Sequence, residues 1–306
     1  MLISKVTLYS NDVDQMRHFY VHELGFTLIE SSEDAFSIKA GCSELEIRKS
    51  HSDEEPFYHF AFNIPQNKFK EAKTWAKSKV TLHKEDDEDE VYFEHSDAYS
   101  LYFSDPSHNI VEFIARNSSA ASEENFSVQS VINISEINIT TNDVMSAGKG
   151  LIQFGVPVRY EESVKEDGLN FMGEYEEGAF LLLGPRGRRW IFSDKKAEVY
   201  PLSITINHKK NIEIDSKGEI RFTDCRDSRQ PKRSGVEVSH MVKKEYSMAV
   251  FYLSSYLLCR GLIPVKQPAI KSVCFGTLLE HIGLIFSAIV RDYKNIYTID
   301  EVFISF

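Results

Sequence analysis

The feature that most constrains the fold of this 306-residue chain is an internal repeat. The segment V-T-L-Y-S-N-D-V at residues 6–13 returns as I-N-I-T-T-N-D-V at residues 137–144. Each copy predicts a strand followed by a helix, and each continues to a glycine (Gly25 or Gly155) and a further strand. Recurrence at roughly 55 to 65 residues per unit predicts an assembly of similar modules rather than one unrepeated core.

The first two units read alike. In unit one, a strand over residues 2–10 precedes a helix that Asn11-Asp12 can cap, and three short strands follow, giving the order β-α-β-β-β. Unit two restarts with a strand at residues 58–64, which Pro65 ends before an amphipathic helix over residues 66–78. Its remaining strands run to Arg116. An acidic run at residues 85–90 interrupts them and is typical of a solvated loop.

The closing hairpin of unit two, residues 100–116, contains an unusual carboxylate. Two strands of alternating pattern flank the turn Asp105-Pro106-Ser107-His108-Asn109, whose proline and Asx side chains favour a tight turn. Glu112 then lies in the otherwise apolar second strand. It either faces water on an edge strand or points into a cavity, where it needs a metal, a cation or a proton.

The remainder of the chain is less regular. Residues 117–130 predict a polar linker, and residues 131–222 a third, degenerate module with extra strands. No repeat continues into residues 223–306, which we leave unassigned as a C-terminal tail.

These residues resemble a known family. His18-Phe19-Tyr20 followed by Glu23-Leu24-Gly25-Phe26, together with D-P-S-H-N-I-V-E-F at residues 105–113, is similar to the vicinal oxygen chelate (VOC) superfamily. That group includes glyoxalase I, extradiol dioxygenases and bleomycin resistance proteins. The resemblance implies an α+β fold of repeated β-α-β-β-β modules, in which residues 1–52 and 56–116 pair to form one cup-shaped site.

The resemblance also implies a divalent metal, Fe, Mn, Ni, Zn or Co, and no nucleotide cofactor. By motif, the ligands would be His59, Glu112 and Glu46. Lys5 stands where the family has His or Gln, and an ammonium group does not ligate. Two arrangements therefore stay open. In one, three ligands hold a metal, Glu46 doubles as general base and Lys5 contacts the substrate. In the other, Lys5 replaces the metal between Glu46 and Glu112.

The third module reads as a structural copy. Its equivalent of Lys5 is Glu136, and an alignment of Gly184-Pro185 with Asp105-Pro106 puts Ile191 at the position of Glu112. The basic turn at residues 186–189 is either a solvated hairpin tip or an anion contact.

Two functions fit this reading. The first is a metal-dependent enzyme of lyase, isomerase or dioxygenase type that acts on a small oxygen-rich substrate. The alternative is a metal-free protein that binds or sequesters a small molecule, as bleomycin resistance proteins do. Its ligand, apolar or cationic, would lie among aromatic side chains, namely Tyr58, Phe60, Tyr92, Tyr99 and Tyr102.

Composition narrows the partners and the compartment. A formal net charge of −11 argues against nucleic acid, because phosphate neutralisation needs a basic face. No apolar stretch reaches the roughly 18 to 20 residues that a membrane-spanning helix needs. Four scattered cysteines and an N-terminus without signal-peptide character predict a cytoplasmic protein with reduced thiols. A homodimer stays open, since a second subunit could complete the third module.

Overall fold

The computed structural model describes residues 1–51, 54–175 and 178–224. The chain divides into two compact units, Met1–Arg229 and Gln230–Phe306, and the second lies outside the described residues. The predicted tail therefore lies outside them as well, apart from residues 223–224, which end the last described strand. The boundaries predicted for the modules and for the tail stay predictions.

The first module has the predicted order of elements. β1 pairs in parallel with β4, and β4 and β2 flank β3 in antiparallel pairs. The Asp12 carboxylate accepts a hydrogen bond from the Gln15 N–H and so caps the helix, as the Asn-Asp pair predicts. The elements are β1 (Ile3–Ser10), α1 (Val13–Arg17), η1 (His18–Glu23), β2 (Thr27–Ser31), β3 (Ala35–Ala40) and β4 (Ser43–Lys49).

The second module repeats this arrangement. β5 pairs in parallel with β8, and β7 lies antiparallel between β8 and β6. Buried Ala72 and Ala76 on α2 allow the helix to pack closely on the sheet. The elements are β5 (His59–Asn63), η2 (Gln66–Lys68), α2 (Phe69–Lys77), β6 (Val91–Phe93), η3 (Glu94–Ser96), β7 (Ala98–Ser104) and β8 (Ile110–Arg116).

The third module is shorter. β9 pairs in parallel with β11, and β11 pairs with β10, while Val158 replaces the remaining strand with a single bridge to Met172. A three-stranded antiparallel meander follows. The elements are η4 (Val128–Ser130), β9 (Asn133–Thr141), α3 (Val144–Gln153), η5 (Arg159–Glu161), β10 (Asn170–Met172), β11 (Phe180–Pro185), β12 (Leu202–Ile206), β13 (Lys210–Ile214) and β14 (Ile220–Asp224).

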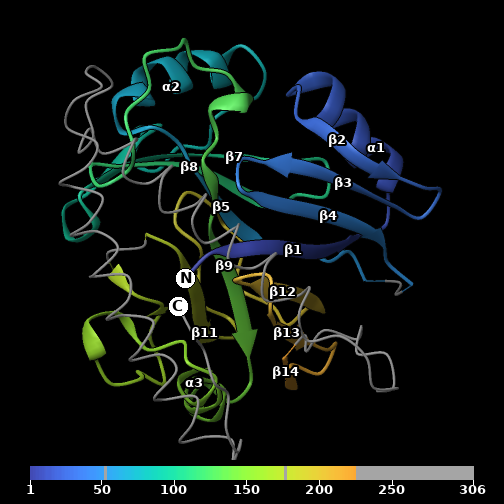
Figure 1. Ribbon diagram of the computed structural model, residues 1–306, viewed down its shortest axis with the longest axis vertical. Coiled ribbons are helices and arrows are strands. Elements are labelled where there is room, and N and C mark those ends of the chain that lie inside the picture. The colour runs from blue at the N-terminus through green and yellow to red at the C-terminus, as the bar shows by residue number, and fades with distance from the viewer. Residues whose placement is uncertain (52–53, 176–177, 225–306) are drawn as a thin grey trace, which may run out of the picture. The chain divides into compact units, whose positions relative to one another are not determined.

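The modules join differently from the prediction. β5 pairs antiparallel with β9, in the register Phe60 to Ile137, whereas β1 pairs antiparallel with β12. Figure 1 shows β9 beside β5 and β12 beside β1. Modules two and three therefore form one part of a single sheet, and module one and the meander form the other part. β1 and β9 join the two parts, because Ile3 pairs with Ile134. The prediction had joined modules one and two because consecutive units are most often neighbours.

The turn between β7 and β8 explains the D-P-S-H-N motif. The buried Asp105 carboxylate accepts hydrogen bonds from the Asn109 N–H, at 3.0 Å, and from the Tyr20 hydroxyl, at 2.8 Å. The Asn109 side-chain oxygen accepts the Tyr58 N–H at 2.7 Å. The motif thus ties η1 of module one to the start of β5, and its role in this chain is structural.

One large hydrophobic core runs through the three modules and the meander. Within the described residues, no helix is both long enough and apolar enough to cross a membrane.

The turn between β3 and β4 gives a test of how the modules meet. Gly41 has φ +61°, and a Cβ added there would lie 2.0 Å from the Ile132 carbonyl oxygen, which also accepts the Cys42 N–H. We expect Gly41→Ala to lose about 1–2 kcal/mol to the left-handed conformation and a further 1–3 kcal/mol or so to the steric conflict with backbone.

Gly25→Ala is the matched control. Gly25 has φ +87°, but the nearest atom to an added Cβ is 3.9 Å away, so this variant should carry only the conformational cost. Urea unfolding followed by near-ultraviolet circular dichroism compares the two. Equal losses of unfolding free energy in the two variants would show that the close approach of the turn to Ile132 does not require glycine at position 41.

Candidate metal centre

A cavity of about 280 Å³ lies where modules two and three meet. Three of its polar side chains come from three different strands. His59 is the first residue of β5, Glu112 lies in the middle of β8, and Glu136 lies in β9. Aromatic and aliphatic side chains form most of the rest of the wall, including Phe93, Tyr102, Leu169, Phe171, Leu182 and Trp190.

The backbone fixes the tautomer of His59. Its Nδ1 lies 3.0 Å from the Ile110 carbonyl oxygen, which can only accept, so Nδ1 carries the hydrogen. The lone pair of Nε2 then faces the cavity, 3.4 Å from Glu112 Oε2. Burial lowers the pKa of His59 to about 4, so its imidazole is neutral at pH 7 and suited to ligate a metal.

The two carboxylates are almost fully buried. Glu112 is 2% exposed and Glu136 is 5% exposed. Burial raises the pKa of Glu112 to about 8, with the nearby Glu136 carboxylate adding to the shift. Burial also raises the pKa of Glu136, although its ion pair with Arg116 opposes that shift. Two carboxylates in one apolar cavity thus disfavour each other's charge.

Ligand atoms of these three residues lie within 4.8 Å of one another. One neutral imidazole and two carboxylates form a donor set that suits first-row divalent metals. The strand register shows why a fourth ligand is missing. Glu112 lies opposite Ala61 in the β5–β8 pair, and the corresponding residue opposite Asn138 in the β9–β11 pair is Leu182. The geometry therefore offers three protein ligands and leaves the other positions open.

The sequence prediction had placed Ile191 at this fourth position, and the structure differs. Gly184-Pro185 ends the closing strand β11 instead of preceding it as Asp105-Pro106 precedes β8. Ile191 lies in the turn that follows β11 and is 36% exposed.

Of the predicted site residues, His59 and Glu112 come together, and Glu46 and Lys5 lie elsewhere. Lys5 Nζ lies 2.8 Å from Glu44 and 3.2 Å from Glu46, in the part of the sheet where module one meets the meander. Glu46 also accepts hydrogen bonds from Thr7 and Arg48, both at 2.8 Å. Glu46 is therefore already compensated, and Lys5 does not bridge it to Glu112.

Glu136 is the member that the sequence prediction missed. The repeat aligns it with Lys5 and with His59, so a signal was present. The prediction set it aside because the third module was read as packing. The aromatic residues predicted to surround a ligand do not all lie at the cavity. Tyr102 lines it, whereas the Tyr58 hydroxyl donates to the Pro201 carbonyl. Tyr92 and Tyr99 contact each other at the surface, with tilted rings.

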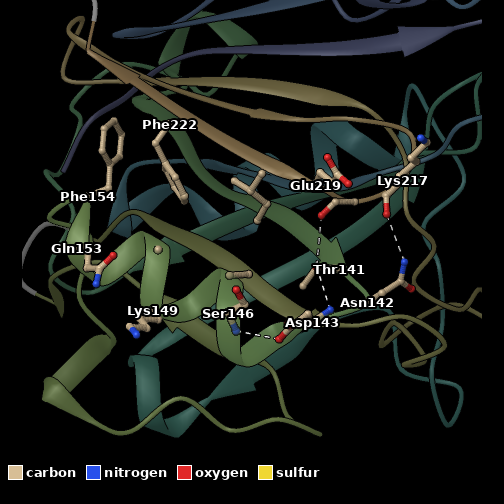
Figure 2. Close-up of a pocket in the computed structure, with 14 residues that line it drawn as sticks. Thr141, Asn142, Asp143, Ser146, Lys149, Gln153, Phe154, Lys217, Glu219 and Phe222 are labelled. Carbon is tan, nitrogen blue, oxygen red and sulfur yellow. Dashed lines mark hydrogen bonds between the residues drawn. The ribbon is translucent and has the colours of Figure 1, made fainter.

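Two larger hollows lack such a convergence. One, of about 840 Å³, lies between α3 and the β13–β14 turn, and Figure 2 shows hydrogen bonds from Thr141, Asn142 and Asp143 to neighbouring groups in its wall. There Asp143 caps α3 through the Ser146 N–H, and the Asn142 amide donates to the Lys217 carbonyl. The other hollow, of about 960 Å³, lies between β1 and the meander. Neither hollow contains a cluster of metal ligands among the described residues.

Comparison with protein families gives one match. The family model described as toxoflavin-degrading enzyme matches residues 134–188, a stretch that includes Glu136. No curated protein matches the chain.

Among solved structures, three illustrate the likeness. A lactoylglutathione lyase from Agrobacterium tumefaciens is 21% identical and covers 37% of this chain and 91% of its own, with a TM-score of 0.31. A glyoxalase/bleomycin resistance protein/dioxygenase from Alicyclobacillus acidocaldarius is 21% identical, covering 38% and 91%, with a TM-score of 0.32.

The third is a fosfomycin resistance protein from Listeria monocytogenes, complexed with Mn(II) and 1S,2S-dihydroxypropylphosphonic acid. It is 20% identical and covers 40% of this chain and 92% of its own, with a TM-score of 0.30. The chain resembles the VOC superfamily. That resemblance was the sequence prediction, and it is confirmed. At these identities the likeness to the solved structures carries no conclusion about activity.

The buried carboxylates predict an unusual pH dependence in protein freed of divalent metal. Folded Glu112 keeps its proton up to about pH 8, whereas the unfolded chain loses it near the ordinary value of 4.5. The folded state then binds more protons, so stability falls as pH rises through this range. His59, which is neutral in the folded state, opposes this fall near pH 6.5, where unfolded histidine is about half protonated, but it does so in wild type and in a Glu112 variant alike.

As the pH rises from 6.5 to 8, the unfolding free energy of Glu112→Gln should therefore increase relative to that of wild type by up to about 2 kcal/mol. One proton contributes about 1.4 kcal/mol per pH unit. Chelator-treated protein, unfolded with urea at several pH values, supplies the measurement. Glu46→Gln is the control, because ion pairing lowers the pKa of Glu46 and takes its titration out of this window. Parallel stability curves for wild type and Glu112→Gln would contradict the raised pKa of Glu112.

Proposed function

We propose that His59, Glu112 and Glu136 bind a divalent metal, and that the protein is an enzyme acting on a small, oxygen-rich substrate in this cavity. The observation that carries the proposal is the convergence of three buried acceptor groups within 4.8 Å. A neutral imidazole lone pair and two carboxylates in an apolar cavity need a cation or a proton between them. A divalent metal supplies the cation without protonating either carboxylate.

The surrounding contacts support this donor set. The Ile110 carbonyl orients the His59 ring, and Arg116 binds one oxygen of Glu136 from the side. Asn63 fixes Arg116 in turn, through a hydrogen bond of 2.9 Å to the guanidinium. Outer contacts of this kind hold metal ligands in place before the metal arrives. When bound, the metal would polarise a carbonyl or hydroxyl oxygen of the substrate and stabilise negative charge there.

The cavity walls define what the chain itself contributes. Trp190 lies beside His59, with ring centroids 4.7 Å apart, and Tyr102 stacks on Phe192 at 4.8 Å. These rings exclude water and favour a flat substrate. Burial and the nearby Glu112 carboxylate raise the pKa of Tyr102 well above its ordinary value, so its hydroxyl stays protonated and can donate a hydrogen bond. The base role predicted for Glu46 passes to the cavity carboxylates, since Glu46 lies outside it.

Metal content tests the proposal. Protein purified without chelator should contain close to one equivalent of Mn, Fe, Ni, Zn or Co by elemental analysis. His59→Ala, Glu112→Gln and Glu136→Gln should each bind Mn(II) at least about tenfold more weakly after chelator treatment. Glu46→Gln is the matched control and should bind metal as wild type does, because Glu46 already pairs with Lys5 and Arg48. Circular dichroism confirms that each variant folds.

Folded wild-type protein that holds no metal and takes up none would overturn the metal-dependent enzyme. Loss of metal with Glu46→Gln and retention with Glu136→Gln would overturn the ligand set proposed here and restore the site predicted from the sequence.

A metal-free binding protein is the second candidate, and one observation favours it. With a pKa of about 8, Glu112 is neutral at pH 7, and Glu136 has Arg116 as partner, so the cavity is electrostatically consistent without a metal. Such a protein would bind a small flat molecule between the aromatic walls and release it unchanged. Recovery of the unaltered ligand after prolonged incubation, with affinity independent of Mn(II), would support this function over the enzyme.

A further inference from the structure

The turn after β11 contains three arginines in different situations. Arg186 forms an ion pair with Glu198, and Arg189 forms one with Glu85. Arg188 has no carboxylate partner among residues 1–51, 54–175 and 178–224. It is also the arginine of this turn that lines the cavity.

The guanidinium of Arg188 is only partly used. Its Nη1 donates to the Arg189 carbonyl at 3.1 Å. Its Nε is buried, and no atom of the described residues accepts its hydrogen. A buried, unsatisfied donor on a charged group is costly, and in native proteins such a donor usually has a water, an ion or a ligand as its partner. Burial accordingly lowers the pKa of Arg188 from its ordinary value.

Packing holds this guanidinium in place. Its central carbon lies 4.1 Å from the centroid of the Trp190 ring, and that ring lies against His59. The backbone is also fixed, because the Arg188 carbonyl accepts the Ala197 N–H at 2.7 Å and Trp190 donates to the Lys195 carbonyl at 3.0 Å. The side chain therefore needs little further ordering to bind a ligand.

The balance of charges indicates the sign of that ligand. Glu136 is paired with Arg116, whereas Arg188 has no such partner among the described residues. With a divalent metal bound and both carboxylates ionised, the metal, the two arginines and the two carboxylates together leave two positive charges in excess. The metal-bound cavity therefore attracts an anion and opposes a cation.

We propose that Arg188 binds the oxyanion of a small anionic substrate, a carboxylate or a phosphonate, inside the cavity between modules two and three. The planar guanidinium offers paired donors that match two oxygens of such a group. The volume of about 280 Å³ admits a molecule of roughly ten non-hydrogen atoms at about 30 Å³ for each water-sized group. This proposal names the substrate class of the site proposed above and rests on that site being the binding cavity.

Calorimetric titration of the full chain tests it with a defined panel. The anionic probes are mandelate, a 2-hydroxy carboxylate, and phenylphosphonate, and the neutral probe is mandelamide. Each is titrated into wild type, Arg188→Gln, Arg188→Lys and Arg186→Gln, with Mn(II) and after chelator treatment. Arg186→Gln removes the same charge from the same turn but from an exposed, paired residue, so it is the matched control.

We expect wild type to prefer at least one anionic probe over mandelamide, and the probe that binds distinguishes a carboxylate site from a phosphonate site. Arg188→Gln should weaken that binding at least about tenfold, the loss expected for a charge-assisted hydrogen bond. Arg188→Lys should recover only part of it, because an ammonium group keeps the charge and loses the fork. Arg186→Gln should bind as wild type does.

The failures are distinguishable. The role of Arg188 is overturned if anion binding survives Arg188→Gln. It is also overturned if wild type prefers mandelamide or binds neither anion, even when Mn(II) still binds. Loss of Mn(II) binding in wild type, with anion binding that still depends on Arg188, overturns the metal-dependent enzyme and leaves the anion site standing.

Discussion

Two buried carboxylates and an imidazole nitrogen cannot share an apolar cavity unless a cation or a proton lies between them. His59, Glu112 and Glu136 are in this position because β5 and β9 pair antiparallel and bring the first strands of two modules side by side. The contacts around the group follow from that constraint. Arg116 lies beside Glu136, the Ile110 carbonyl orients His59, and aromatic rings keep water out.

The same repeat position has different chemistry in the two parts of the sheet. Lys5, His59 and Glu136 occupy equivalent places at the start of their modules. Where modules two and three meet, the position supplies two acceptors, His59 and Glu136, to one cavity. Where module one meets the meander, Lys5 is paired with Glu44 and Glu46, and a third of its side chain is exposed. The ammonium group compensates these two carboxylates, so they need no metal ion.

Much of the local structure could be predicted from the sequence. The alternation of residues and the capping Asp12 predicted the elements of the first two modules, since these signals act over a few residues. Glu112 was singled out as a carboxylate in an apolar strand, and His59 was named through the resemblance to the VOC superfamily. What failed was the pairing of modules. Each first strand has an open edge that any other first strand can satisfy, and no local signal says which one does.

That failure explains the errors in the site. With module two joined to module one, Glu46 was the natural third ligand and Lys5 an obstacle. With module two joined to module three, Glu136 takes the place and Lys5 no longer matters. The sequence alignment put Ile191 at the position of Glu112, where the structure has Leu182. This error has a similar cause, because Gly184-Pro185 fits the end of a strand as well as the turn before one.

The differences between module three and module two change the charge of the cavity. In module two the closing strand supplies Glu112, and in module three the corresponding residue is Leu182, which removes one negative charge from the cavity. The turn beyond that strand adds the positive charge of Arg188. Both changes move the potential of the cavity in the same direction, towards an anion. Under the role proposed for Arg188, module three supplies the half of the cavity that recognises the substrate, and its difference from module two serves that role.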